Sequence, residues 1–231
     1  MIVGSGLLAC AFAENFQQRS DVCIYAAGVS NSSCTNSSEF VRERQRLIAA
    51  LQTADSVSAF VYFGTCSVED SEALRTQYVQ HKLAMEQLVA KHPNHMILRL
   101  PQLAGNSPNP HTLLNFLYAR IARSEAFTVW RNAYRNIIDV DDVAVLAGLM
   151  IDDRSLRHCT VNLANPNSYS MPEIINKMEQ VVGKRAIYET VELGRNYTID
   201  VAKMVSLLPQ SMIRFDAHYL IRVLSKYYEK I

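Results

Sequence analysis

Two segments in the first half of the chain predict its fold: Ser58-Ala59-Phe60-Val61-Tyr62-Phe63-Gly64-Thr65 and Tyr78-Val79-Gln80-His81-Lys82. The first is rich in aromatic and β-branched residues, which is typical of a buried strand, and it presents the hydroxyl of Thr65 at its end. The second lies in a predicted helix, on which residues four positions apart share one face. The ammonium of Lys82 is therefore expected beside the phenol of Tyr78, although the same spacing also occurs as an exposed pair on many helices.

Thr65, Tyr78 and Lys82 are candidate catalytic residues. A phenol titrates at pH ~10 in water, and a fixed neighbouring cation favours its ionised form. Because a general acid or base works best close to neutral pH, this pairing suits Tyr78 to proton transfer. The Thr65 hydroxyl can add a hydrogen bond to the same reacting oxygen.

Strand and helix patterns alternate on both sides of these segments. The alternation predicts an α/β fold with a mostly parallel, doubly wound sheet and with its chemistry at the carboxyl ends of the strands. We expect a core at 1–110 and a smaller α+β region at 111–231 that is interleaved with it. Predicted strands cover 1–3, 21–26, 58–63, 95–100, 127–130 and 160–163, and predicted helices cover 7–18, 37–52, 75–91, 113–123, 140–151, 171–183 and 217–229.

A glycine turn stands between the first strand and the first helix, with the sequence Gly4-Ser5-Gly6-Leu7-Leu8-Ala9. Glycines at this place let backbone N–H groups and the positive end of a helix approach a pyrophosphate, and a small Ala9 lets the helix pack on the strand. The turn is thus a candidate dinucleotide cradle, with an ordinary strand-helix turn as the alternative. The second strand ends in the small residues Ala26, Ala27 and Gly28, which leave open space at its carboxyl end.

The composition excludes several classes of partner. The 231 residues carry a net charge of +1, with 49% hydrophobic and 19% charged residues. This balance gives no electrostatic footprint for nucleic acid or an anionic membrane. Five scattered cysteines without a paired spacing, no basic leader and no long apolar run predict a cytoplasmic protein with free thiols. The histidines lack metal-ligand spacing, so no metal site is expected.

Taken together, the motifs resemble those of the extended short-chain dehydrogenase/reductases, in particular the NAD-dependent nucleotide-sugar epimerase, dehydratase and reductase branch. The matches follow the family's order along nearly the whole chain. They are the glycine turn at 3–9, the small-residue strand end at 24–28, the strand at 62–68 with Thr65, the pair Tyr78 and Lys82, the strand Leu98-Arg99-Leu100-Pro101, the segment 135–143 and the late strand and helix at 162–174.

The resemblance implies a Rossmann-like fold, a nicotinamide cofactor and a nucleotide-sugar substrate, with NAD and NADP not distinguished. Tyr78 would exchange a proton with the sugar, Lys82 would hold the cofactor ribose, and Thr65 would bond the reacting oxygen. Arg135 would contact the substrate diphosphate, because its guanidinium pairs bidentately with phosphate oxygens. Asn115 and Arg131 are further substrate candidates. Cofactor contacts are implied for Gly4, Ser5, Gly6, Leu7, Leu8, Ala26, Ala27, Gly28, Tyr78, Lys82, Leu100 and Pro101.

The chain departs from the family pattern near its N-terminus. The family's first glycine falls on Val3, and only a few residues separate the first helix from Asp21, where relatives insert further strands. Those strands carry the acidic residue that binds the adenosine ribose, about 20 positions after the glycines. We therefore expect a reduced number of strands and an incomplete adenine pocket. If the strand at 21–26 lies on the opposite side of the first strand from the missing strands, either the first helix changes face or its crossover breaks the right-handed rule.

The residues after Thr65 bear on the reaction. Dehydratases of the family carry Asp-Glu there, and this chain has Cys66-Ser67, so dehydration is disfavoured. Reduction of a 4-keto sugar or an epimerisation needs only Thr65, Tyr78, Lys82 and the cofactor. The alternative is a non-catalytic binding or regulatory relative that has lost the adenine pocket. A homodimer through helices 37–52 and 75–91 is a further expectation.

Overall fold

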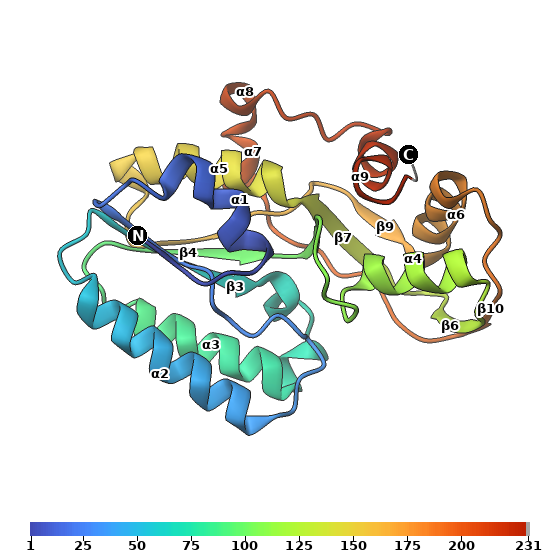
Figure 1. Cartoon of the computed structure of the whole chain (residues 1–231), viewed down its shortest axis with the longest axis horizontal. Coiled ribbons are helices and arrows are strands. Elements are labelled where there is room, and N and C mark those ends of the chain that lie inside the picture. The colour runs from blue at the N-terminus through green and yellow to red at the C-terminus, as the bar shows by residue number, and fades with distance from the viewer. Residues whose placement is uncertain (230–231) are drawn as a thin grey trace.

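A computed structural model of the chain describes residues 1–229 and shows a parallel five-stranded sheet (Figure 1). The strand order is β1-β2-β3-β4-β8, and every neighbouring pair is parallel. The strands are β1 (Ile2–Val3), β2 (Val22–Tyr25), β3 (Ala59–Thr65), β4 (His95–Leu100) and β8 (Cys159–Asn162). This confirms the predicted α/β class with few strands.

Helices cover both faces of the sheet (Figure 1). α1 (Leu7–Phe16) and α5 (Val140–Asp152) lie on one face, and α2 (Ser37–Thr53) and α3 (Gln77–Val89) lie on the other. The strand residues alternate accordingly, because successive side chains of a strand point to opposite faces. Ile24 packs in the cluster with α1 and α5, whereas Tyr25 packs in the cluster with α2 and α3.

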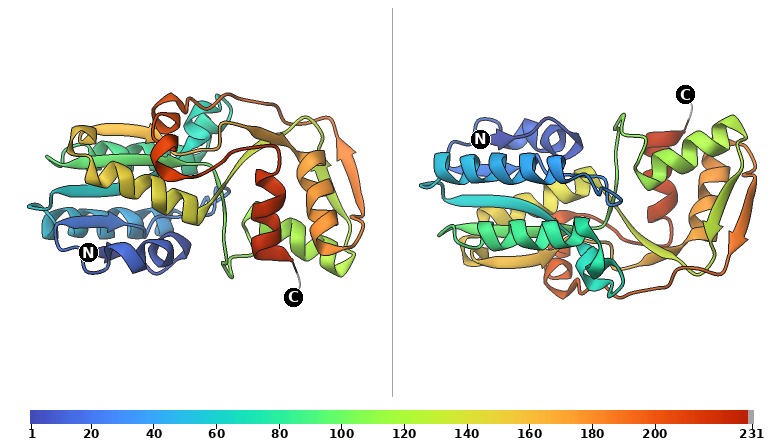
Figure 2. Two further views of the ribbon diagram at one scale, coloured as in Figure 1. Left: turned by 90° about the horizontal axis from the view of Figure 1, so that it is seen from above. Right: turned by 90° about the horizontal axis from the view of Figure 1, so that it is seen from below.

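The crossover from β1 to β2 has an unusual hand. The steps from β1 to β2, β2 to β3 and β3 to β4 all run in the same direction across the sheet. The helix of the first step lies on the opposite face from the helices of the other two (Figure 2), so its hand must be opposite. Since about 98% of such crossovers are right-handed, we assign the left hand to β1-α1-β2. Two outcomes were expected from the shortened N-terminus, a first helix on the other face or a crossover against the right-handed preference, and the structure shows the second.

The second part of the chain builds its own apolar core beside the carboxyl ends of the sheet (Figure 2). This core is formed mainly by α4 (Leu113–Arg123), α6 (Met171–Val182) and α9 (Tyr219–Tyr228), with β6 (Phe127–Trp130) pairing in parallel with β10 (Tyr188–Val191). A three-stranded sheet of β5 (Gln102–Ala104), β7 (Tyr134–Asp139) and β9 (Ser168–Ser170) connects the two parts. Because α5 and β8 return to the main sheet, the division at residue 110 stays an interpretation.

Most predicted elements lie within two residues of their expected bounds. The predicted strands at β4 and β6 and the predicted helix α4 match, and Ser170 caps α6 with Pro172 in its first turn. The sequence Asn165-Pro166-Asn167-Ser168 predicts a turn, and this prediction is wrong at its end, because Ser168 begins β9. Elements not predicted are β5, β7, β9, β10, η1 (Cys66–Glu69), η2 (Ala73–Arg75), η3 (Arg154–Leu156), α7 (Ala202–Val205) and α8 (Leu208–Ser211). Within residues 1–229 the structure has no helix long and apolar enough to cross a membrane.

Candidate active site

Thr65 is the last residue of β3, at the carboxyl edge of the sheet. It pairs across the ladder with Leu100, so Leu100 and Pro101 end the neighbouring strand at the same edge. The side chain is buried, and its Oγ1 accepts a hydrogen bond of 3.1 Å from the backbone N–H of Ser67. This bond caps the turn after the strand and uses a lone pair of the hydroxyl, not its proton.

Tyr78 and Lys82 lie on the same face of α3, which packs on β3. The helix begins after Thr76, whose Oγ1 accepts a 3.3 Å hydrogen bond from the N–H of Val79. Both side chains are turned inward, with exposed fractions of 8% for Tyr78 and 3% for Lys82. The Lys82 Nζ lies 6.0 Å from the centroid of the Tyr78 ring. The pair is therefore not an exposed surface pair, and it sits beside the strand that ends in Thr65.

A carboxylate that the sequence interpretation missed holds the Lys82 ammonium. Glu43 of α2 is 2% exposed, and its Oε1 lies 3.2 Å from Nζ of Lys82. The same oxygen accepts a 3.0 Å hydrogen bond from the hydroxyl of Tyr62, while Oε2 contacts the N–H of Val29 at 2.7 Å and His81 Nε2 at 3.0 Å. One signal could have found it: Glu43 follows Phe40 by three and precedes Leu47 by four, which places it on the apolar face of the helix.

These contacts keep Glu43 ionised inside the protein. Burial alone would raise the pKa of this carboxyl group, but the hydrogen bond to His81, the charge of Lys82 and the Val29 N–H outweigh it and lower the pKa to about 2. Glu43 and Lys82 thus form a buried ion pair. They also fill the space at Gly28, where a Cβ would lie 2.5 Å from Nζ of Lys82. A side chain at position 28 would have to displace this ammonium.

The glycine turn has the geometry of an anion site. Gly4 has φ +129°, and a Cβ on it would lie 2.5 Å from the carbonyl oxygen of Ala26, so a glycine is required for the turn to approach the end of β2. Gly6 is the N-cap of α1 and supplies no side-chain cap, and the space where its Cβ would stand is open. The first N–H groups of α1, after Ser5, therefore face an open position. Such a position fits a phosphate group.

Arg135 of β7 lines a cavity of about 150 Å³, shared with Phe116 and Trp130, whose lining contains neither Thr65, Tyr78 nor Lys82. Its guanidinium donates a 2.8 Å hydrogen bond to the carbonyl oxygen of Tyr134 and forms no salt bridge to any side chain in residues 1–229. Burial lowers the pKa of Arg135 from its usual value. A half-buried cation without an acidic partner, next to two aromatic rings, is suited to an anionic ligand that carries a flat group.

A family model matches residues 9–164, more than half of the chain, and its description is the NAD dependent epimerase/dehydratase family. The chain belongs to this family. The match begins at Ala9, so the glycine turn itself lies outside it. No curated protein matches the chain significantly.

Solved structures of the epimerase/dehydratase type share the fold. The UDP-glucuronic acid 4-epimerase of Bacillus cereus, in complex with UDP-glucuronic acid and NAD, is 17% identical with a TM-score of 0.73 over 98% of this chain and 88% of that chain. The UDP-N-acetylglucosamine 4-epimerase of Bacillus cereus is 16% identical with a TM-score of 0.74 over 97% and 93%. The dTDP-glucose 4,6-dehydratase of Bacillus anthracis, in complex with NAD, is 14% identical with a TM-score of 0.68 over 90% and 71%.

For a member of an NAD-dependent family, the residues present fit one end of a dinucleotide better than the other. The turn from Gly4 to Leu8 fits the diphosphate, and Lys82 lies below Gly28 at the next strand end. In a doubly wound sheet the carboxylate for the adenosine ribose stands on a strand beyond β1, and within residues 1–229 β1 is an edge strand of the main sheet. The residues therefore fit the diphosphate better than the adenosine.

Asn115 and Arg131, the two further candidates for substrate contacts, bond other parts of the chain. Asn115 donates 2.8 Å hydrogen bonds to the carbonyl oxygens of Ser107 and Asn109, and its Oδ1 accepts one of 2.7 Å from the hydroxyl of Tyr228. These bonds secure the loop before α4. Arg131 is exposed and pairs with Glu192 at 3.1 Å. Of the three substrate-side candidates beyond Thr65, only Arg135 lines the 150 Å³ cavity.

Arg195 is another residue that the sequence interpretation missed. Its guanidinium bonds Asp70 and Ser71, which lie in the turn between β3 and α3, and its backbone carbonyl accepts a 3.2 Å hydrogen bond from the N–H of Tyr134. The coil that carries Arg195 is therefore tied to the segment that connects Thr65 with Tyr78. No spacing in the sequence signals this contact, because the two partners are more than 120 positions apart.

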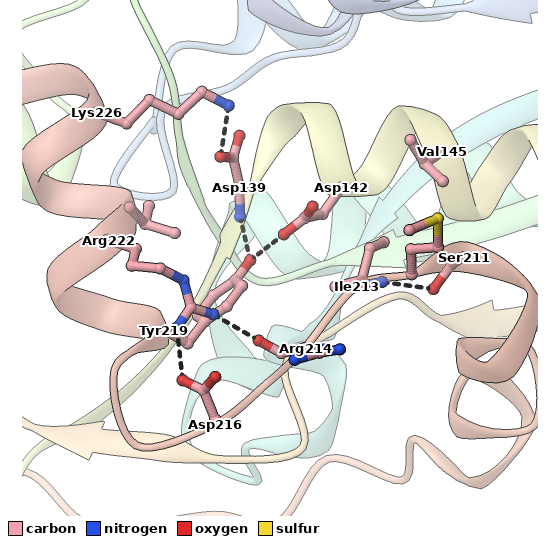
Figure 3. Close-up of a pocket in the computed structure, with 12 residues that line it drawn as sticks. Asp139, Asp142, Val145, Ser211, Ile213, Arg214, Asp216, Tyr219, Arg222 and Lys226 are labelled. Atoms are coloured by element: carbon pink, nitrogen blue, oxygen red, sulfur yellow. Dashed lines mark hydrogen bonds and ion pairs between the residues drawn. The ribbon is translucent and has the colours of Figure 1, made fainter.

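A cavity with a volume of about 630 Å³ lies elsewhere, between α5, α8 and α9 (Figure 3). The hydroxyl of Tyr219 donates to Asp142 Oδ2 at 2.6 Å and accepts from the N–H of Asp139 at 2.9 Å, and Lys226 Nζ lies 2.8 Å from Asp139 Oδ2. These contacts dock α9 on α5. Neither Thr65, Tyr78 nor Lys82 lines this cavity, and in the part of the chain that the structure describes no group of three or more His, Cys, Asp or Glu could hold a metal ion.

The low pKa of Glu43 predicts how stability depends on pH. The pKa of Glu43 in the folded chain lies below its ordinary value of 4.5. Ionisation of Glu43 therefore stabilises the fold above about pH 4.5, and this contribution is lost as the pH falls towards about 2. We expect wild type to exceed Glu43→Gln in free energy of unfolding by on the order of 3 kcal/mol at pH 7 and by less than about half of that at pH 3. Urea denaturation at the two pH values measures both differences.

As a control, Glu72→Gln alters a carboxylate whose side chain is 79% exposed and should leave the unfolding free energy nearly unchanged at both pH values. A wild-type advantage over Glu43→Gln that stays the same at pH 7 and pH 3 would show that folding does not change the pKa of Glu43, and would contradict the lowered pKa.

Proposed function

We propose that the chain is an NAD(P)-dependent oxidoreductase or epimerase that acts on a nucleotide-linked deoxysugar, by 4-keto reduction or by epimerisation, with Tyr78 as the general acid and base. One observation carries the proposal. Thr65 and the pair Tyr78 and Lys82 are buried on packed neighbouring elements, at the sheet edge where an uncapped glycine turn faces open space. The solved relatives with NAD and UDP-glucuronic acid support the choice of cofactor and substrate class.

Each candidate site residue has a defined role in this proposal. The Tyr78 phenol gives a proton to the carbonyl oxygen of a keto sugar, or takes one from the hydroxyl of the reduced sugar, and the Thr65 hydroxyl donates a hydrogen bond to the same oxygen. The Lys82 ammonium lies near the phenol and is available to a ribose hydroxyl at Gly28. The nicotinamide supplies or accepts the hydride. Gly4 to Leu8 hold the diphosphate of the cofactor, and Arg135 holds that of the substrate.

Dehydration stays disfavoured, because the two residues after Thr65 do not supply an acid and a base. The thiol of Cys66 is buried and donates a 3.3 Å hydrogen bond to the carbonyl oxygen of Arg99. Burial raises the pKa of this thiol well above its ordinary value, so it does not ionise at neutral pH. The other position holds Ser67, whose hydroxyl is a weak acid.

The second candidate function is a binding or regulatory protein without turnover. The lack of a strand beyond β1 within residues 1–229 favours it, because the adenosine ribose then lacks the carboxylate that such a strand would carry. Calorimetry with NADH and NADPH separates the two functions. Binding of neither cofactor by wild type, with or without nucleotide sugars, would reject the enzyme.

The assignment of Tyr78 predicts the phenotype of Tyr78→Phe. The variant keeps the ring and loses the proton, so turnover should fall by about 10²- to 10⁴-fold while the calorimetric affinity for NADH stays within about threefold of wild type. Tyr188→Phe is the control, since that tyrosine lies on β10 and its loss should change neither quantity. Full activity of Tyr78→Phe would exclude the assigned mechanism.

The role proposed for Arg135 predicts that the substrate diphosphate binds in the cavity that Arg135 lines. Trp130 lines the same cavity and is the only tryptophan of the chain, so its fluorescence should respond to UDP or dTDP. Arg135→Gln should weaken this binding by about 10- to 100-fold, since hydrogen bonds to a charged group contribute about 1.5–3 kcal/mol. Arg131→Gln tests the competing candidate on an exposed residue. A larger loss in Arg131→Gln than in Arg135→Gln would move the diphosphate away from Arg135.

We also propose a homodimer through α2 and α3, which lie side by side on the outer surface of the sheet (Figure 1). Val41 on α2 is 53% exposed, and burial of such a side chain favours association. Static light scattering at micromolar concentration should give a dimer for wild type and a monomer for Val41→Lys. Val145→Lys, on α5 of the opposite face, should remain a dimer. A monomeric wild type would contradict this interface.

A further inference from the structure

Glu43 is a charged residue in the packing face of α2, and the four contacts of its carboxylate reach three other segments around the site. Its carboxylate joins Val29 after β2, Tyr62 on β3, and His81 and Lys82 on α3. An ionised carboxylate has about four lone-pair positions for hydrogen bonds. Two contacts on each oxygen therefore saturate the group, and Glu43 has no capacity left to act as a base itself.

The Lys82 ammonium is correspondingly constrained. Of its three protons, one is directed to Glu43 Oε1 at 3.2 Å and one to the hydroxyl of Tyr62 at 3.4 Å. The Tyr62 hydroxyl in turn donates to the same Glu43 oxygen. One ammonium proton remains for a ligand, directly below the backbone of Gly28. A lysine that is 3% exposed cannot keep its charge at low cost without such a carboxylate.

We propose that Glu43 is a positioning residue, which holds Lys82 as a buried ammonium below Gly28 and beside Tyr78. Its role in the reaction rests on the proposed function, because it acts on cofactor only through Lys82. Glu43 accounts for the charge state of Lys82 and for the place of Nζ, and the Tyr62 hydroxyl completes the arrangement. Glu43 thus joins Thr65, Tyr78 and Lys82 as a fourth residue of the candidate site. It lies on α2, which carries no other candidate site residue.

A second buried ion pair of the same helix layer provides a matched control. Glu86 of α3 is 6% exposed and bonds Arg99 through two contacts of 3.0 and 2.7 Å. It lies one helical turn beyond Lys82 and makes no hydrogen bond to it. Glu86→Gln removes a comparable buried charge without touching the Lys82 ammonium, so it reports the general effect of breaking a pair in this layer.

The charge of Lys82 depends on all the titratable groups that face it. Loss of the Glu43 charge leaves a buried lysine among neutral or distant groups, and burial then favours loss of its proton as the pH rises. The groups are Glu43 on α2, Tyr25 on β2, Tyr62 on β3, and Tyr78, His81 and Glu86 on α3. Because Glu43 is the only carboxylate among them in contact with Nζ in residues 1–229, its removal should dominate the effect.

Two measurements on the full chain test the proposal. The first is acetylation of Lys82 by acetic anhydride at pH 8, read by peptide mass spectrometry, which reports the fraction of free amine. We expect Glu43→Gln to raise the acetylation rate of Lys82 by about tenfold or more over wild type, and Glu86→Gln to raise it by less than about twofold.

The second measurement is the calorimetric affinity for NADH at pH 6.5 and pH 9. Glu43→Gln should lose at least about tenfold at pH 9 and clearly less at pH 6.5, whereas the ratio of Glu86→Gln to wild type should not change with pH.

The outcomes separate the two proposals. A wild type that binds neither NADH nor NADPH rejects the proposed function, while acetylation still decides whether Glu43 sets the state of Lys82. Equal acetylation and equal affinities in Glu43→Gln and Glu86→Gln overturn the positioning role. Where Glu43→Gln does not fold by circular dichroism, Glu43→Asp carries the test. Its shorter side chain should raise acetylation of Lys82 by about threefold, and an unchanged rate would overturn the proposal.

Discussion

The buried ion pair between Glu43 and Lys82 connects the elements on which the candidate site is built. A charge inside a protein is tolerated only when it is paired and its remaining hydrogen bonds are satisfied. Here that requirement brings α2 and α3 together over the ends of β2 and β3, with the Tyr62 hydroxyl between the two charges. The same requirement explains Gly28, since a side chain there would displace the ammonium. The place of the Lys82 ammonium and the lack of a side chain at position 28 are therefore both tied to this one interaction.

Much of the fold and part of the site could be predicted from the sequence, for identifiable reasons. Strands such as β3 and β4 are buried on both faces and appear as continuous apolar runs, and α6 carries both a serine cap and a glycine end. The strands β9 and β10 are short and partly exposed, so their composition does not differ from that of loops. Thr65, Tyr78 and Lys82 were visible because a helix and a strand place them in a fixed local relation.

Glu43 and Arg195 were not visible, because their partners are distant in the chain. A glutamate in an amphipathic helix ordinarily faces water, and only the fold shows that Lys82, 39 positions later, lies opposite it. The hand of the first crossover was undecidable for a similar reason. Right-handed connection is a strong preference of strand-helix-strand units, but α1 buries Phe12 and Phe16 against the sheet and α5, which fixes the helix on that face. Tertiary packing has therefore overridden the local rule.

The left-handed crossover also explains how a shortened sheet can keep a candidate active site. In a doubly wound sheet the ligand lies across the carboxyl ends of the strands. The glycine turn follows β1, Gly28 follows β2, Thr65 ends β3 and Leu100 ends β4, while Tyr78 and Lys82 lie on α3, which packs on β3. The implied contacts for the diphosphate and the reacting end of a cofactor thus lie on or beside four consecutive strands. Strands on the far side of β1 would contribute only to the adenosine. Their absence therefore removes one subsite and leaves the geometry of Thr65, Tyr78 and Lys82 intact, because those residues depend on α2 and α3, on the opposite face from α1.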